Sequence, residues 1–323
     1  MATSDRLQLK VADLHCEARD VMVLELRASD GAALPPFTPG AHLELYLPGN
    51  LIRHYSLCND SVERDRYCVG VGLARDSRGG SRYVHQNLRV GSTLATSTPR
   101  NNFPLELQAD EYVFIAGGIG ITPIMSMIRA CESRHRNWRL YYCARNRQRT
   151  AFYEELRSLA PERDDPRLHF HFDDEQDGRY FDAAAVLAGT APTAHIYTCG
   201  PEPLMRAVEA ATATHPQDRV HFEWFTAAAV DTAGDRPFTI KLASSGATYE
   251  VPPGRSILDV LEDHDLGVPY SCREGLCATC RTGVISGIPD HRDSVLTAAE
   301  RASNREMMIC VSRAQSEVLE LEL

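Results

Sequence analysis

Long apolar runs, positive charge and cysteine are all scarce in this sequence of 323 residues. One long uncharged stretch, Tyr112 to Ile128, is interrupted by three glycines and a proline. It is too short to span roughly 30 Å of hydrocarbon, which argues against a membrane protein. The 34 Lys and Arg residues are outnumbered by 44 Asp and Glu, and a net charge of −10 argues against nucleic acid as a partner.

Ten cysteines in a chain of this length are too few for a disulfide scaffold. The opening segment, Met1 to Arg6, has no apolar core. No secretory signal is therefore indicated, and the expected location is the cytoplasm.

The composition that remains is that of a globular protein, with 43% hydrophobic and 24% charged residues. Residues 1–108 are expected to form an antiparallel β-barrel, because short alternating segments such as His42–Leu47 end in turn residues. Residues 109–226 alternate between strand and helix patterns, which predicts a doubly wound α/β domain with a parallel sheet. Residues 227–236 are small and polar and are predicted to form a linker, and residues 237–323 to form a compact α+β domain.

The last domain contains a cysteine loop. Cys272, Cys277 and Cys280 are spaced C-x4-C-x2-C, and 29 residues separate Cys280 from Cys310. This spacing is typical of plant-type [2Fe–2S] ligation. Structural zinc is the alternative, although zinc sites usually use two close pairs and Cys310 has no near partner. Five further cysteines are interpreted as small buried hydrophobic residues: Cys16, Cys58, Cys68, Cys131 and Cys143.

Two glycine turns follow predicted strands of the α/β domain. The first runs from Gly117 to Pro123, where Thr122 suits a helix N-cap and Pro123 the first helical position. The second is Cys199-Gly200-Pro201. Because carboxyl ends of parallel strands share one edge of the sheet, both turns are expected to approach one nicotinamide dinucleotide. A glycine turn is also a simple connection between any strand and helix, so neither turn decides alone.

Asp173 ends the third predicted strand, where an acidic residue would face the adenosine ribose and repel a 2′-phosphate. This position favours NAD. A solvated turn is the alternative interpretation, and the nearby basic run Arg145 to Arg149 is a competing argument for NADP.

The predicted barrel carries two further motifs. Arg53-His54-Tyr55-Ser56 lies on a strand, and Arg78-Gly79-Gly80-Ser81 precedes a short helical pattern. Arg53 and the helix start at Ser81 suit a phosphate, while Tyr55 suits a planar ring and Ser56 a hydrogen bond to it. Ordinary cross-strand packing is the alternative.

Together these motifs resemble the ferredoxin-NADP reductase superfamily, and most closely the phthalate dioxygenase reductase family. The resemblance extends over essentially the whole chain, including His221–Phe225 and His291–Asp293. It implies an FMN barrel, an NAD domain and a β-grasp ferredoxin domain with its [2Fe–2S] cluster. It assigns FMN to Arg53, His54, Tyr55, Ser56, Gly79, Gly80 and Ser81, with Phe225 near the flavin and nicotinamide rings. It assigns NADH to Gly117, Gly118, Gly120, Thr122, Pro123, Asp173, Cys199, Gly200, Pro201 and Phe225. Trp224 is bulkier than the Ser or Gly that the family commonly has there.

The same resemblance implies a function. Electrons would pass from NADH through FMN to the cluster, and then to the Rieske component of an aromatic oxygenase. Ser56 would tune flavin N5, and Cys199 would line the nicotinamide pocket unless it is only a buried structural thiol. The protein would act as a monomer that docks transiently with its partner. Alternatives are a reductase for a vanillate O-demethylase or carnitine-type oxygenase, and a non-enzymatic iron–sulfur carrier or redox sensor.

Overall fold

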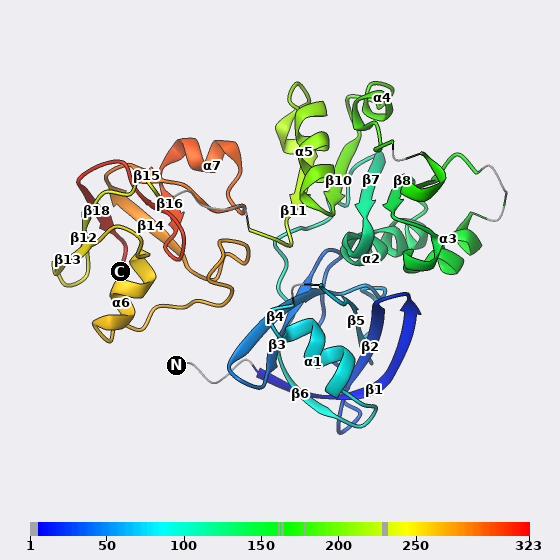
Figure 1. The fold of residues 1–323 in the computed structure, drawn as a ribbon, viewed down its shortest axis with the longest axis horizontal. Coiled ribbons are helices and arrows are strands. Elements are labelled where there is room, and N and C mark those ends of the chain that lie inside the picture. Colours follow the sequence, from blue (N-terminus) through cyan, green and yellow to red (C-terminus); the bar gives the residue numbers. More distant parts are fainter. Residues whose placement is uncertain (1–5, 76, 161, 163–164, 178, 228–231) are drawn as a thin grey trace. The chain divides into compact units, whose positions relative to one another are not determined.

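The computed structural model describes residues 6–75, 77–160, 162, 165–177, 179–227 and 232–323. Its internal contacts divide the chain into two compact units, Ala2–Phe225 and Thr226–Leu323. The predicted linker, 227–236, begins just after this division, and its residues 228–231 lie outside the described part. Figure 1 follows the chain through both units.

The first unit begins with an antiparallel sheet in the strand order β4-β3-β6-β1-β2-β5. An isolated bridge between Leu57 and Val69 joins the two ends of this order and closes the sheet into the expected barrel. Alternate residues of each strand fill its interior with leucine and valine. The strands are β1 (Arg6–Ala18), β2 (Val21–Ala28), β3 (His42–Leu47), β4 (Leu51–Ser56), β5 (Tyr67–Gly72) and β6 (Thr93–Ser97), with helix α1 (Gly80–Asn87) between β5 and β6.

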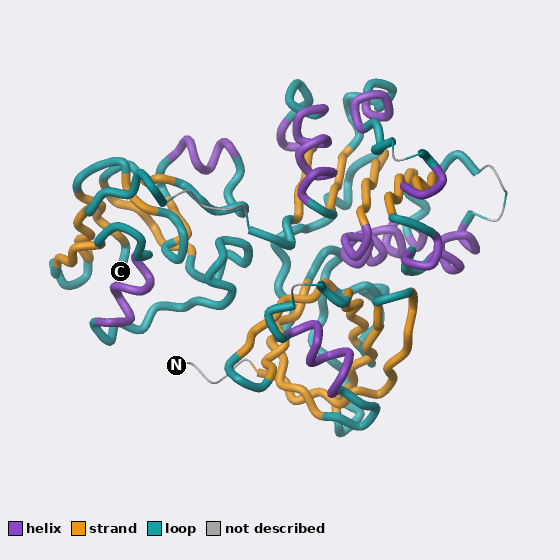
Figure 2. The backbone as a smooth tube through the Cα atoms, in the orientation of Figure 1, coloured by secondary structure: helices purple, strands orange, loops and turns teal. Residues whose placement is uncertain are grey.

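A five-stranded parallel sheet in the order β11-β10-β7-β8-β9 completes the first unit, as the alternating pattern predicts. Residues of α2 and α3 pack in one hydrophobic cluster and residues of α4 and α5 in another, so the helices cover both faces of the sheet (Figure 2). The strands are β7 (Glu111–Gly117), β8 (Asn137–Ala144), β9 (Leu168–Phe172), β10 (His195–Cys199) and β11 (Val220–Glu223). The helices are α2 (Ile121–Ser133), α3 (Tyr153–Leu159), α4 (Ala183–Leu187) and α5 (Glu202–Ala211).

One detail of α2 differs from the sequence-based expectation. The helix begins at Ile121 after a short 3-10 turn, Gly118–Gly120, and Gly120 is its N-cap. Thr122 is therefore not the cap, and Pro123 is not the first helical residue. The Thr122 hydroxyl donates instead to the carbonyl oxygen of Ile119 at 2.9 Å, because the 3-10 turn places that oxygen within reach.

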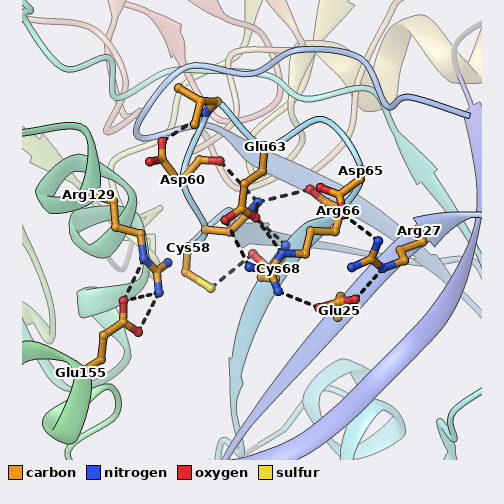
Figure 3. Close-up of polar contacts among 12 residues, drawn as sticks. Glu25, Arg27, Cys58, Asp60, Glu63, Asp65, Arg66, Cys68, Arg129 and Glu155 are labelled. Atoms are coloured by element: carbon orange, nitrogen blue, oxygen red, sulfur yellow. Dashed lines mark hydrogen bonds and ion pairs between the residues drawn. The ribbon is translucent and has the colours of Figure 1, made fainter. Parts of the chain in front are cut away.

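The barrel and the parallel sheet share a core. Cys58 and Cys68 from the barrel belong to the same buried cluster as the residues of α2 and α3. Beside them, Arg129 of α2 makes a double hydrogen bond with Glu155 of α3, at 2.6 and 2.7 Å (Figure 3). The two folds of this unit are therefore fixed against each other by buried apolar contact.

The cysteines outside the loop only partly match the interpretation as buried residues. Cys58, Cys68 and Cys131 are buried, but Cys16 is exposed. The reason is a register shift in β1 between Cys16 and Ala18, which disturbs the alternation of faces at the end of the strand. Cys143 is partly buried.

The second unit is a mixed five-stranded sheet in the order β13-β12-β18-β14-β16, with β12 and β18 parallel. Helix α6 (Ile257–Asp263) packs its apolar residues into the core of this sheet, and Ser256 caps the helix through a reciprocal bond with Asp259. The strands are β12 (Phe238–Leu242), β13 (Thr248–Val251), β14 (Arg281–Ser286), β15 (Pro289–Asp290), β16 (Glu306–Met308), β17 (Arg313–Ala314) and β18 (Val318–Leu321), with α7 (Ala298–Ser303) before β16. Among the residues described in both units, no helix is long and apolar enough to cross a membrane.

Candidate functional site

The two glycine turns meet at the carboxyl edge of the parallel sheet. They follow the neighbouring strands β7 and β10, and a Cβ on Gly117 would lie 2.5 Å from the ring of Pro201. A Cβ on Gly120 would collide with the backbone carbonyl oxygen of Cys199. The connections from β7 and β10 leave in opposite directions along the sheet at this point, which is where open α/β sheets bind nucleotides. The turns thus form one cradle that only glycine permits.

Next to this cradle, a polar corner joins the sheet to the barrel. Glu223, at the end of β11, lies in register with Cys199 at the end of β10. The hydroxyl of Ser56, the last residue of β4, donates to the Glu223 carboxylate at 3.4 Å. Ser56 and Cys199 are buried, whereas Glu223 is partly open to solvent. The structure therefore brings together Ser56 and Cys199, the residues expected beside flavin N5 and in the nicotinamide pocket, around a carboxylate.

Desolvation controls the protonation of the Glu223 carboxyl and the Cys199 thiol in this corner. The Glu223 carboxyl is largely surrounded by protein, which raises its pKa to about 8, and the bond from Ser56 opposes this only in part. Burial, with a further contribution from the neighbouring Glu223, raises the pKa of the Cys199 thiol well above its usual value. At neutral pH the Cys199 sulfur is therefore a neutral thiol rather than a nucleophile.

Glu223 was not among the residues singled out as a site, although the sequence contains a signal for it. It is the one carboxylate within the strand β11, between Phe222 and Trp224. The structure also gives the bulky Trp224 a packing partner. The guanidinium carbon of Arg206, on α5, lies 4.7 Å from the centroid of the Trp224 ring. The predicted residue Phe225 follows it and leaves 38% of its surface exposed.

A second group lies at the start of α1. Arg53 donates to the carbonyl oxygens of Ile52 and Arg78, each at 2.8 Å, and a Cβ on Gly80 would lie 2.5 Å from the Arg53 side chain. Gly79 precedes the helix at φ +94°, a conformation that favours glycine. The hydroxyl of Ser81, in the first turn, bonds to Ser77. A guanidinium beside a glycine-rich helix start can hold a phosphate, so these residues fit a mononucleotide.

Tyr55 and His54 lie on opposite faces of β4. Tyr55 packs against the barrel core near α1, and burial raises the pKa of its phenol to about 12. His54 points to the face shared with Glu44 and His42. The structure thus separates His54 from the Arg53 group with which the resemblance placed it.

Asp173 begins a short 3-10 turn directly after β9 and is about half exposed. Two arginines of the competing basic run have acidic partners. Arg147 pairs with Glu175 at 3.1 Å, and Arg149 pairs with Asp20 of the barrel at 2.5 Å. Less positive charge is therefore available at this edge than the sequence indicates.

In the cysteine loop, backbone amides donate hydrogen bonds to sulfur atoms. The amides of Glu274 and Leu276 donate to the sulfur of Cys272 at 3.3 and 3.4 Å, and the Cys272 amide donates to the sulfur of Cys277 at 3.4 Å. Gly275 has φ +67°, and a Cβ there would lie 2.7 Å from Val311. Such donors around thiolates are what an iron–sulfur cluster requires.

Side-chain contacts link the four cysteines of the loop. Neighbouring cysteine thiols raise the pKa of Cys277 and of Cys310, whereas the bond with Cys310 lowers the pKa of Cys280. In the described part of the chain, no group of three or more His, Cys, Asp or Glu side chains could hold a metal ion.

Comparisons with known proteins match the parallel-sheet domain of the first unit and the second unit. Residues 114–210 match the oxidoreductase NAD-binding domain, and residues 240–315 match the 2Fe-2S iron-sulfur cluster binding domain. The chain is 43% identical over 318 residues to tetrachlorobenzoquinone reductase of Sphingobium chlorophenolicum, covering 98% of each protein. It is 42% identical over 318 residues to phthalate dioxygenase reductase of Burkholderia cepacia, covering 98% of this chain and 97% of that protein.

Solved structures give the same relationship. A phthalate dioxygenase reductase, described as a modular structure for electron transfer from pyridine nucleotides to [2Fe-2S], superposes with a TM-score of 0.72 at 42% identity and covers 98% of each chain. An intact type IV self-sufficient cytochrome P450 monooxygenase superposes with a TM-score of 0.90 at 35% identity, and this chain spans 41% of its length. The chain belongs to the phthalate dioxygenase reductase family, whose members are oxidoreductases that combine a flavin-binding barrel, an NAD-binding domain and a [2Fe-2S] domain.

Proposed function

We propose that this chain is the reductase component of a Rieske-type aromatic oxygenase. It takes electrons from NADH, passes them through FMN and a [2Fe–2S] cluster, and delivers them to the oxygenase. We further propose that it works in the cytoplasm as a monomer that meets the oxygenase transiently. The names of relatives support the oxygenase, because several are reductase subunits of dioxygenase systems.

The observation that carries this proposal is the polar corner of Ser56, Glu223 and Cys199. It lies where the flavin barrel adjoins the nucleotide edge of the parallel sheet, so a nicotinamide and a flavin ring can be held against each other there. A flavin bound there would supply the chemistry that couples NADH, a two-electron donor, to a one-electron cluster.

The residues of the chain have distinct roles in this scheme. The turns at Gly117–Pro123 and Cys199–Pro201 hold the dinucleotide, with Asp173 at its ribose. Arg53, Gly79, Gly80 and Ser81 would hold the FMN phosphate, Tyr55 and Phe225 would lie near the rings, and Ser56 would tune flavin N5. The thiolates of Cys272, Cys277, Cys280 and Cys310 hold the cluster.

An anaerobic titration with NADH tests this function. We expect the flavin absorbance to bleach first and the cluster absorbance to follow, with two electrons taken up per NADH. A carrier or sensor that does not react with NADH would leave both bands unchanged, and that result would refute the proposal.

Direct quinone reduction is a second candidate, favoured by the relative named tetrachlorobenzoquinone reductase. A quinone takes both electrons and needs no protein acceptor. Steady-state assays with a halogenated benzoquinone and with the purified oxygenase separate the two functions. The variant Cys310→Ser should lose only oxygenase reduction if quinone is reduced at the flavin.

A further inference from the structure

A short turn that precedes α7 lies against the cysteine loop. Its first residue, Asp293, is 4% exposed. Through one oxygen, Oδ1, the Asp293 carboxylate accepts hydrogen bonds from the backbone amides of Val295 at 3.0 Å and Leu296 at 2.8 Å. Aspartate commonly stabilises a turn in this way, by bonding to amides a few residues further along the chain. The side chain of Asp293 therefore fixes the backbone of residues 293–296.

Arg301 of α7 holds the same turn from the helix. Its guanidinium donates to the carbonyl oxygen of Asp293 at 2.5 Å and to that of Leu296 at 3.1 Å. Thr297 and Glu300 form a capping box at the start of α7, which stabilises the short helix that carries Arg301. Hydrogen bonds from a charged donor are stronger than those between neutral groups. The turn is thus held both by its own aspartate and by the helix after it.

The turn contacts the cysteine loop at Gly275. The amide of Ser294 donates to the carbonyl oxygen of Gly275 at 3.0 Å. A Cβ on Gly275 would lie 3.0 Å from the Cα atom of Asp293 and 2.7 Å from the side chain of Val311. Val311 directly follows Cys310, the fourth cysteine of the cluster motif. Gly275 is therefore packed between the turn and the chain beside Cys310, with no room for a side chain.

Gly275 is also the residue between the two amides that donate to Cys272. The N–H groups of Glu274 and Leu276 lie 3.3 and 3.4 Å from the Cys272 sulfur. Gly275 has φ +67°, and this left-handed conformation turns the chain between the two donors. A displacement of Gly275 would therefore move both donors relative to the sulfur.

Hydrogen bonds to a ligand sulfur affect the reduction potential of an iron–sulfur cluster. They stabilise negative charge on the sulfur, and this charge increases when the cluster accepts an electron. Lengthening or removing them therefore lowers the potential, which makes electron transfer from a flavin to the cluster less favourable.

We propose that Asp293 and Arg301 are positioning residues that set the reduction potential of the [2Fe–2S] cluster, because they hold Gly275 and with it the two amides that donate to Cys272. This inference rests on the proposed function, since it takes Cys272 as a ligand of the cluster. Both side chains act through the backbone of the turn, so neither is a catalytic residue.

Two variants of Asp293 separate the effect of the turn from the effect of charge. Asp293→Asn removes the negative charge but keeps an oxygen that can accept from both amides. The other carboxylate oxygen, Oδ2, is buried without a hydrogen-bond partner among the described residues, so Asn sacrifices no bond there. Asp293→Ala removes the charge and the acceptor together. Loss of the negative charge alone raises the potential of the cluster, whereas loss of the turn lowers it.

Redox titration of the purified holoprotein, followed by EPR of the reduced cluster, compares these variants. We expect the midpoint potential of Asp293→Ala to fall below that of Asp293→Asn. The expected fall makes electron transfer from flavin to cluster about tenfold less favourable, which corresponds to about 59 mV for one electron. The EPR g-values should change in Asp293→Ala and remain those of wild type in Asp293→Asn.

Arg301→Gln is an independent test, and Arg305→Gln is its matched control. Both substitutions remove one positive charge, but Arg301 donates to the turn whereas Arg305 is an exposed residue after the helix. We expect Arg301→Gln to lower the midpoint potential more than Arg305→Gln does, and to change the g-values where the control does not.

Two results would overturn this proposal. One is equal potentials and g-values for Asp293→Ala and Asp293→Asn, and the other is equal effects of Arg301→Gln and Arg305→Gln. If Asp293→Ala does not fold, the arginine pair decides. These titrations use dithionite as the reductant and need no NADH. Failure of NADH to bleach the wild-type protein would instead refute the proposed function, so the two failures are distinguishable.

Discussion

Glu223 is the residue whose surroundings most change its chemistry. Its pKa of about 8 lies above its ordinary value of 4.5, so the folded protein keeps a proton that the unfolded chain loses. The stability from this group is fully present below about pH 4.5 and is lost as the pH rises through about 8. The exposed part of the residue lowers the size of this effect.

We therefore expect Glu223→Gln to become more stable than wild type as the pH rises from about 5 to about 9, by roughly 1–2 kcal/mol. Urea unfolding followed by tryptophan fluorescence measures this, because both tryptophans, Trp138 and Trp224, lie in the first unit. Glu202→Gln, an exposed position on α5, is the control. Parallel pH profiles for wild type and Glu223→Gln would contradict the raised pKa.

Asp173 is the second residue with a separable effect. Because Arg147 and Arg149 are engaged by Glu175 and Asp20, we expect Asp173 to dominate the charge that an adenosine ribose would meet at this edge. Asp173→Arg should raise the ratio of NADPH to NADH use by at least about tenfold, which corresponds to roughly 1.4 kcal/mol. The values of kcat/KM for both nucleotides with ferricyanide measure this ratio. An unchanged ratio, equal to that of Glu154→Arg on α3, would remove Asp173 from the site.

At the scale of elements, the nucleotide cradle depends on how closely two turns approach. A methyl group on Gly120 would meet the fixed carbonyl oxygen of Cys199, whereas one on Gly189 has no atom within 4 Å. We expect Gly120→Ala to cost about 1–3 kcal/mol in stability and to raise the KM for NADH, with Gly189→Ala as the control. Thermal unfolding and NADH kinetics check this expectation. A Gly120→Ala protein with the wild-type unfolding temperature and the wild-type KM for NADH would show that the two turns can separate freely.

The second unit has an ionic connection between distant segments. The side chain of Asp235 is 1% exposed and pairs with Arg292 at 2.7 Å and with Arg313 at 3.3 Å. Arg313 also donates to the carbonyl oxygen of Arg236 at 2.9 Å. The last two residues of the predicted linker therefore make structural contacts with the ferredoxin fold.

Removing this carboxylate would leave the buried Arg313 without its carboxylate partner, whereas Arg292 keeps its pair with Asp290 at 2.7 Å. Asp235→Ala should destabilise the second unit by about 3–5 kcal/mol. Loss of the visible absorption of the cluster on heating reports this, and Glu317→Ala at an exposed position is the control. Equal melting of the two variants would show that the ion pairs contribute little.

At the scale of the whole molecule, each unit has its own hydrophobic core. A chain shortened to end at Thr226 should fold, retain FMN and pass electrons from NADH to ferricyanide. It should not reduce the oxygenase, because the four cluster cysteines are absent. Oxygenase turnover by the shortened chain at the full rate would show that the cluster does not follow the flavin.

The charge of the second unit gives the whole molecule a salt dependence. Residues 237–323 carry 8 Lys and Arg against 13 Asp and Glu, a net charge of −5. Such a surface attracts a basic partner and speeds encounter mainly at low salt. Transfer to the oxygenase should therefore slow as ionic strength rises, whereas reduction of ferricyanide, a small anion, should not follow the same curve.

Much of this protein is determined by local sequence. Alternation with a period of two and turn residues predict the barrel strands, and the alternating segment His42–Leu47 is the strand β3 with the same bounds. The cysteine spacing is likewise local, because one loop supplies three of its four members. In each case the physical cause lies within a few residues along the chain.

Tertiary structure decides what those segments bring together. Ser56 and Glu223 are 167 residues apart in sequence, and only the contact between barrel and sheet makes them partners and gives Glu223 its raised pKa. The face of His54 follows from the register of β3 and β4, which places it beside His42 and Glu44 and away from Arg53. The start of α2 at Ile121 follows from the 3-10 turn that packs Gly120 against Cys199. Pairing, register and burial depend on contacts distant in sequence, so a local pattern cannot specify them.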